Sequence, residues 1–114
     1  MHELGIVFHA IKMIEDICEE NQLSEVTSVT MEFGEVSGVI PEYLQDCWKW
    51  AASKRDWLAG ATLDVQQIDA VTVCNDCGRT YGTVKHGRTC PHCGSEHTEL
   101  LRGTEFEIRD VTAM

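Results

Sequence analysis

Six cysteines in a chain of 114 residues are the side chains best suited to carry chemistry. Four of them form two C-x-x-C pairs, Cys74 with Cys77 and Cys90 with Cys93, and a glycine follows each pair. A C-x-x-C turn directs both thiolates at one ion, and the glycine supplies the positive φ that the tight turn requires. Because four thiolates complete a tetrahedral shell, the spacing predicts a closed, structural zinc site.

Two other uses of paired cysteines are weaker explanations. A thioredoxin-like redox motif needs only one pair, and disulfides belong mainly to oxidising compartments. Met1-His2-Glu3-Leu4 lacks the basic segment and the apolar stretch of a secretory signal, so we expect a cytoplasmic protein with reduced thiols. A redox-sensing role for the thiolates remains an alternative. Three histidines of this segment are either solvated or available as further metal ligands: His86, His92 and His97.

The first three residues form a second candidate metal site. Initiator methionine is normally removed only before a small residue, so His2 is expected to keep Met1 and its free amine in place. The Met1 amine, the His2 amide nitrogen and the His2 imidazole can then chelate one ion, and a planar nitrogen set suits Ni(II) or Cu(II). Glu3 can add a carboxylate or orient the imidazole. A histidine at position 2 is more often only a residue near a chain end, so the pattern alone leaves both interpretations open.

Amphipathic segments must position these two sites. Residues 5–21 place Ile6, Ala10, Ile14 and Ile17 at helical spacing, which predicts a helix. Residues 26–34 alternate apolar and polar side chains and predict a strand. A second helix is predicted to begin at Pro41 and to end near residues 53–55, with Leu44, Cys47, Trp48 and Ala51 inward. Cys18 and Cys47 lie on the apolar faces of these helices and are expected to be small core residues.

Further alternation around Leu63 and Val65, and around Phe106 and Ile108, predicts two more strands. The fold class is therefore α+β, a small three-stranded sheet with two helices plus an inserted zinc-ribbon-like module. Residues 1–70 and 104–114 are expected to form one domain, which would be nickel-binding if the N-terminal site holds Ni(II). Residues 71–103 are expected to form the zinc-binding module, with a short hairpin between the two cysteine pairs.

Composition excludes several classes of function. The formal net charge is −10, and 13 of the 19 acidic residues lie in residues 1–70, which disfavours binding to nucleic acid. The chain has no run of about 18 apolar residues, so no membrane span is expected. It shows no nucleophile–base arrangement, phosphate-binding loop or paired-carboxylate motif, so we do not expect an enzyme. A zinc-ribbon adaptor or nucleic-acid-binding module without nickel function remains the alternative.

The opening Met1-His2-Glu3-Leu4, the Glu32-Phe33-Gly34-Glu35 strand end and the two cysteine pairs together resemble the HypA/HybF family of hydrogenase nickel-incorporation proteins. The resemblance covers the whole chain. It implies a nickel metallochaperone with cargo nickel at His2, Glu3 beside it and the Met1 amine as co-ligand. It also implies structural zinc at Cys74, Cys77, Cys90 and Cys93.

The same resemblance implies partners. These are a GTPase accessory protein, the large subunit of [NiFe]-hydrogenase and, in some organisms, urease with its accessory proteins.

Overall fold

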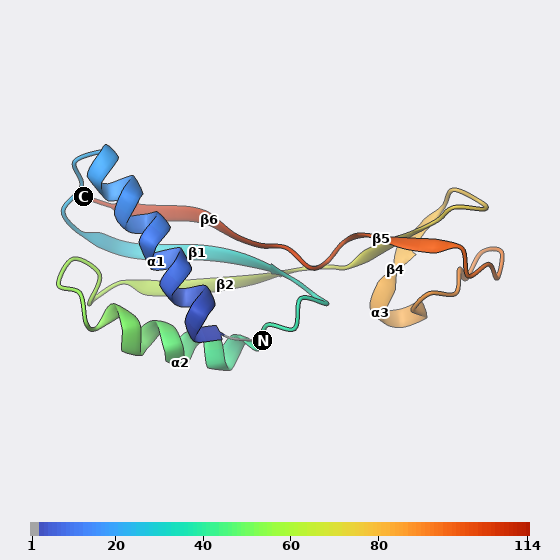
Figure 1. The fold of residues 1–114 in the computed structure, drawn as a ribbon, viewed down its shortest axis with the longest axis horizontal. Helices are drawn as coiled ribbons and strands as arrows, with labels where there is room; N and C mark the ends of the chain where they lie inside the picture. Colours follow the sequence, from blue (N-terminus) through green and yellow to red (C-terminus); the bar gives the residue numbers. More distant parts are fainter. Residues whose placement is uncertain (1–2) are drawn as a thin grey trace. The chain divides into compact units, whose positions relative to one another are not determined.

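The computed structural model describes residues 3–114, so the predicted ligands Met1 and His2 lie outside the described residues. The described chain forms nine elements (Figure 1): α1 (Glu3–Glu20), β1 (Val26–Gly34), α2 (Pro41–Ala52), β2 (Thr62–Ile68), β3 (Val71–Cys74), β4 (Thr80–Gly82), α3 (Thr83–His86), β5 (Thr98–Arg102) and β6 (Phe106–Ala113). None of the helices in residues 3–114 is both long and apolar enough to cross a bilayer.

These elements belong to two compact units. Unit 1 contains the chain up to Glu32, Val39–Gln66 and Glu107–Met114, and unit 2 contains Phe33–Gly38 and Gln67–Phe106. The structure has two three-stranded sheets, with strand orders β2-β1-β6 and β4-β3-β5. The predicted α+β class is confirmed, with a second sheet and the short helix α3 in addition to the predicted helices and strands.

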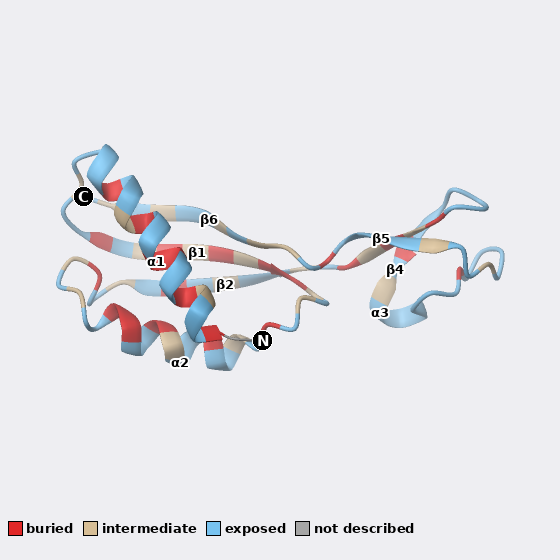
Figure 2. Ribbon diagram, viewed as in Figure 1, coloured by how far each residue is buried: buried red, intermediate tan, exposed pale blue. Residues whose placement is uncertain are grey.

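The central strand of the first sheet has one buried face. Val29 and Met31 are fully buried, whereas Ser28, Thr30 and Glu32 are half-buried. Alternation of this kind is expected when helices cover one face of a sheet and the other face meets solvent. Figure 2 shows the corresponding buried stripes along β1, α1 and α2.

Helix α1 buries a slightly different face from the predicted one. Ala10 and Ile14 are buried as expected, but Ile17 is 36% exposed and Ile6 only half-buried. The buried face continues instead through Val7, Ile11 and Cys18. Two neighbouring stripes of this helix are apolar, so periodicity locates the helix without deciding which stripe meets the core.

Helix α2 begins at Pro41, as predicted, because a proline at this position loses no intrahelical hydrogen bond. Leu44, Trp48 and Ala51 are buried. Cys47 is only half-buried, so the expectation of a core residue was too strong at this position.

Unit 2 is held by short antiparallel strands. β3 pairs with β4 on one side and with β5 on the other, with a register irregularity between Val71 and Thr72. The predicted hairpin lies elsewhere: β3 and β4 flank the first cysteine pair, and the segment between the pairs carries β4 and α3. The reason is that the cysteine turn itself is tight enough to connect two antiparallel strands.

Gly34 permits a close approach of two backbone segments in unit 2. Its N–H donates to the Glu105 carbonyl (2.8 Å), and the Val36 N–H donates to the Gly103 carbonyl (2.9 Å). A Cβ added at Gly34 would lie 1.9 Å from the Gly103 carbonyl oxygen. Only glycine fits at this crossing, which gives a physical reason for the glycine of the Glu32-Phe33-Gly34-Glu35 motif.

Candidate metal centre

The two cysteine pairs have the same backbone geometry. The Gly78 N–H donates to the Cys74 carbonyl and the Gly94 N–H to the Cys90 carbonyl, both at 2.8 Å. Gly78 and Gly94 both have φ of 76°, in the left-handed region where glycine is favoured. The Cys74 N–H donates to the Arg79 carbonyl and the Cys90 N–H to the Ser95 carbonyl, both at 2.9 Å. We call these two turns, Cys74–Gly78 and Cys90–Gly94, the knuckles.

The knuckles bring four sulfur atoms into one cluster. All four Sγ atoms lie within 4.8 Å of one another. The sulfurs of Cys74 and Cys93 are 3.6 Å apart, and those of Cys77 and Cys90 are 3.7 Å apart. Cys74 and Cys90 are buried, whereas Cys77 and Cys93 are exposed, so each knuckle contributes one buried and one exposed thiol.

These distances fit a metal ion better than disulfides. A disulfide would require sulfur atoms about 2.05 Å apart, and all six cysteines are free thiols. In a regular tetrahedron with zinc–sulfur bonds of about 2.3 Å, the sulfurs lie about 3.8 Å apart. The four thiols therefore have the spacing and the donor chemistry of a closed metal shell.

The surroundings shift the pKa values of two of these thiols, Cys74 and Cys93, in opposite directions. The Cys77 backbone N–H holds the pKa of the Cys74 thiol at about 7. The Ser95 backbone N–H lowers the pKa of the Cys93 thiol, but the neighbouring thiols, led by Cys74, and desolvation together raise it to about 12. Four thiolates in so small a volume need a cation, because like charges disfavour each other's ionisation.

The candidate ligands also supply much of the core around them. One buried cluster of unit 2 consists of Cys74, Cys90 and Tyr81. The Tyr81 hydroxyl donates to the Gly87 carbonyl at 2.9 Å. A core built largely of thiols gives little hydrophobic stabilisation, so a metal held by these thiols would supply folding free energy directly.

The three histidines of unit 2 lie outside the sulfur cluster. His97 Nδ1 lies 3.2 Å from Asp76 Oδ2, and the His86 ring packs edge-on against Tyr81 with centroids 5.8 Å apart. His92 contacts the cluster through its backbone N–H, which donates to Cys90 Sγ (3.4 Å). Within residues 3–114, the only metal-ligand group with this clustering contains the four cysteines alone.

Comparison with known proteins places this geometry in a family. The sequence model described as "Hydrogenase/urease nickel incorporation, metallochaperone, hypA" matches residues 1–113. The hydrogenase maturation factor HypA of Chlorobium phaeobacteroides is 35% identical over 112 residues, covering 98% of each chain. The hydrogenase maturation factor HybF of Klebsiella pneumoniae is 33% identical, covering 97% of each. The chain belongs to the HypA family.

The fold agrees with this HypA assignment. The solution structure of the nickel metallochaperone HypA from Helicobacter pylori aligns over 100% of this chain and 98% of that chain, with a TM-score of 0.75 and 20% sequence identity. The resemblance stated from the sequence is confirmed. The HypA family consists of nickel-incorporation metallochaperones, and this member carries a four-cysteine metal-binding group.

The third residue of the Met1-His2-Glu3 motif of this HypA protein has a defined structural place. Glu3 is the first residue of α1 and is buried, with 7% of its surface exposed. Its Oε2 accepts a hydrogen bond from the Ile40 N–H (3.1 Å) at the N-terminus of α2. Ile40 is the N-cap residue of α2, and its own side chain makes no capping hydrogen bond. The sequence did not suggest this contact, because the two residues are 37 positions apart.

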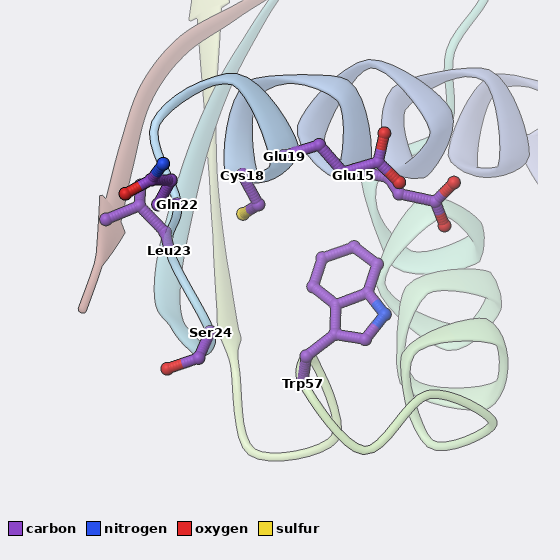
Figure 3. Close-up of a pocket in the computed structure, with 7 residues that line it drawn as sticks. All are labelled: Glu15, Cys18, Glu19, Gln22, Leu23, Ser24 and Trp57. Atoms are coloured by element: carbon purple, nitrogen blue, oxygen red, sulfur yellow. The ribbon is translucent and has the colours of Figure 1, made fainter.

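A cavity of about 370 Å³ lies at the other end of α1 in unit 1 (Figure 3). The labelled side chains around it include Cys18, Trp57, Glu15 and Glu19. Burial raises the pKa of the Cys18 thiol, which keeps it protonated and a poor nucleophile. Cys18 is therefore not the activated nucleophile that covalent catalysis in this cavity would require.

Proposed function

We propose that this chain binds Ni(II) through the Met1 amine and His2, with Glu3 beside them, and delivers it during maturation of [NiFe]-hydrogenase. The observation that carries the proposal is the match to the nickel-incorporation family, which begins at residue 1 and therefore includes Met1-His2-Glu3. An amine, an amide nitrogen and an imidazole form the nitrogen-rich donor set that Ni(II) favours.

The buried position of Glu3 supports this assignment. Its hydrogen bond to Ile40 attaches the start of α1 to the start of α2, so the residue that follows His2 has a fixed position. A chain end next to a fixed residue can present few ligands to solvent, which suits cargo that must later be released. In this proposal Glu3 orients the nickel-binding end from its place in the core.

We further propose that Cys74, Cys77, Cys90 and Cys93 hold a structural zinc ion. The closed set of four thiolates, with sulfur separations near those of a zinc tetrahedron, supports zinc over a catalytic metal with an open position. When bound, the zinc would supply cross-linking of the two knuckles and no reaction chemistry. Residues 1–70 and 104–114 would then be the nickel-binding domain and residues 71–103 the zinc-binding module.

The proposed partners follow from the family. In this proposal the chain is cytoplasmic, a GTPase accessory protein acts with it, and the large subunit of [NiFe]-hydrogenase receives the nickel. The family description also names urease, so urease and its accessory proteins are a second proposed destination.

A nickel titration of the untagged, zinc-loaded chain beside His2→Ala tests the proposal. Calorimetry would measure nickel binding, and mass spectrometry would measure zinc content. We expect the native chain to bind one nickel ion, and His2→Ala to lose nickel while it keeps its zinc. Equal nickel binding by both chains would contradict the N-terminal site, and absence of binding by both would favour a zinc-stabilised adaptor.

A further inference from the structure

Three polar side chains join the two knuckles on their exposed side. The Ser95 hydroxyl, one residue beyond the second knuckle, donates to Oδ2 of Asp76, which lies inside the first knuckle. His97 Nδ1 lies 3.2 Å from the same Asp76 oxygen. The His97 backbone N–H donates to the Ser95 hydroxyl oxygen at 3.0 Å. We call Asp76, Ser95 and His97 the latch.

Backbone hydrogen bonds fix both ends of the latch. The Asn75 N–H donates to the His97 carbonyl at 2.8 Å, which continues the β3–β5 pairing one residue past Cys74. The Cys90 N–H donates to the Ser95 carbonyl at 2.9 Å, so Ser95 also closes the second knuckle. His97 and Ser95 therefore each accept a backbone hydrogen bond from a residue of a knuckle, and Asp76 lies within the first knuckle.

We propose that the latch is a positioning device that slows metal release from the four cysteines. The inference rests on the proposed metal-holding role of those cysteines. A bound ion leaves when its sulfur ligands detach in turn and the two knuckles separate. The latch opposes that separation because its hydrogen bonds join the first knuckle to the segment that closes the second.

The charges of the latch favour this role. The acceptor in the latch is the Asp76 carboxylate, which accepts from the Ser95 hydroxyl and lies beside His97. A hydrogen bond to an ionised acceptor is stronger than one between neutral groups. Asp76 and His97 are exposed, with side chains 53% and 80% accessible, so water weakens each contact and a moderate effect is expected.

Chelator-driven zinc release from the full chain tests the latch. The variants are Asp76→Ala, Ser95→Ala, the double variant, and Ser95→Thr, which retains the hydroxyl. Glu96→Ala is the matched control, because it removes an exposed carboxylate between Ser95 and His97 without altering the latch. The cobalt-substituted forms would report, by their absorption spectra, whether all four thiolates still bind.

We expect Asp76→Ala and Ser95→Ala each to release zinc about three- to tenfold faster than the native chain. The double variant should be no faster than the faster single variant, since both substitutions remove the same contact. Ser95→Thr should restore slow release. The cobalt spectrum and zinc content should stay those of a four-thiolate site in every variant.

The outcomes separate this inference from the proposed function. A native chain that retains no zinc would contradict the structural zinc and the latch with it. A chain that holds zinc but releases it equally fast in all variants would contradict the latch alone. Acceleration by Glu96→Ala equal to that by Asp76→Ala would also contradict the latch, because a general loss of negative charge would then explain the result.

Discussion

Glu3 caps the start of helix α2, a role that its position next to His2 in the sequence does not indicate. Its carboxylate accepts the Ile40 N–H at the start of α2, where the helix dipole favours a negative charge. A substitution here therefore removes a cap as well as a carboxylate next to the candidate nickel site. Loss of nickel in a Glu3 variant would not by itself identify Glu3 as a ligand.

We expect Glu3→Ala to lower the free energy of unfolding of unit 1 by about 1–3 kcal/mol, because it leaves the Ile40 N–H at the start of α2 without its part-buried carboxylate acceptor. His2→Ala should leave that free energy within about 0.5 kcal/mol of the native value. Urea unfolding followed by tryptophan fluorescence would measure both, since Trp48 is buried in unit 1. Equal stability of Glu3→Ala and the native chain would contradict the capping role.

Among the individual residues of the site, the four cysteines were predictable from the sequence, whereas the contacts of the latch were not. Cysteine has few uses in a reducing compartment, so two spaced pairs carry a strong signal. Asp76 and Ser95 are common surface residues 19 positions apart, and only the folded knuckles bring them together. A spacing argument finds ligands that share one ion but misses contacts between exposed polar side chains.

The elements of unit 1 were predictable because each one is long enough to show its period. β1 and α2 begin at the expected residues, and α1 differs only in its ends and in the face that it buries. The strands of unit 2 contain three to five residues, too few for a period of two to be visible. Their pairing depends on the cysteine turns rather than on an apolar pattern.

Substitution of Gly34 tests whether the close approach of two backbone segments requires a glycine. A methyl group there would collide with the Gly103 carbonyl, so Gly34→Ala should destabilise the crossing by about 3 kcal/mol or more. Gly82→Ala is the control, because its Cβ would meet nothing within 4 Å and its φ is −69°. Thermal unfolding of the two variants would give the comparison, and equal melting temperatures would contradict the close-approach argument.

The whole molecule contains two units with different sources of stability. Unit 1 buries an apolar core that includes Ile11, Ile14, Met31 and Leu44. The buried cluster around the metal centre of unit 2 consists of two cysteines and a tyrosine. The first unit should therefore fold by hydrophobic burial, and the second should depend on its metal.

Metal removal should consequently affect the units unequally. After the proposed zinc ion is withdrawn by a chelator, we expect amide hydrogens of β3, β4 and β5 to lose their protection from exchange, while those of α1 and α2 keep theirs. Hydrogen exchange followed by mass spectrometry would measure both. Protection that persists in β3–β5, or disappears from both units together, would contradict separate stabilisation.

The proposed nickel site uses the N-terminal amine and is separate from the proposed zinc site. The most direct measurement is a nickel titration of the zinc-loaded chain with its Met1 amine either free or acetylated, because only the proposed chelate uses that amine. We predict that acetylation abolishes nickel binding and leaves zinc content unchanged. If the acetylated chain binds nickel as tightly as the free chain, the nickel site lies elsewhere and the account of this end of the molecule is wrong.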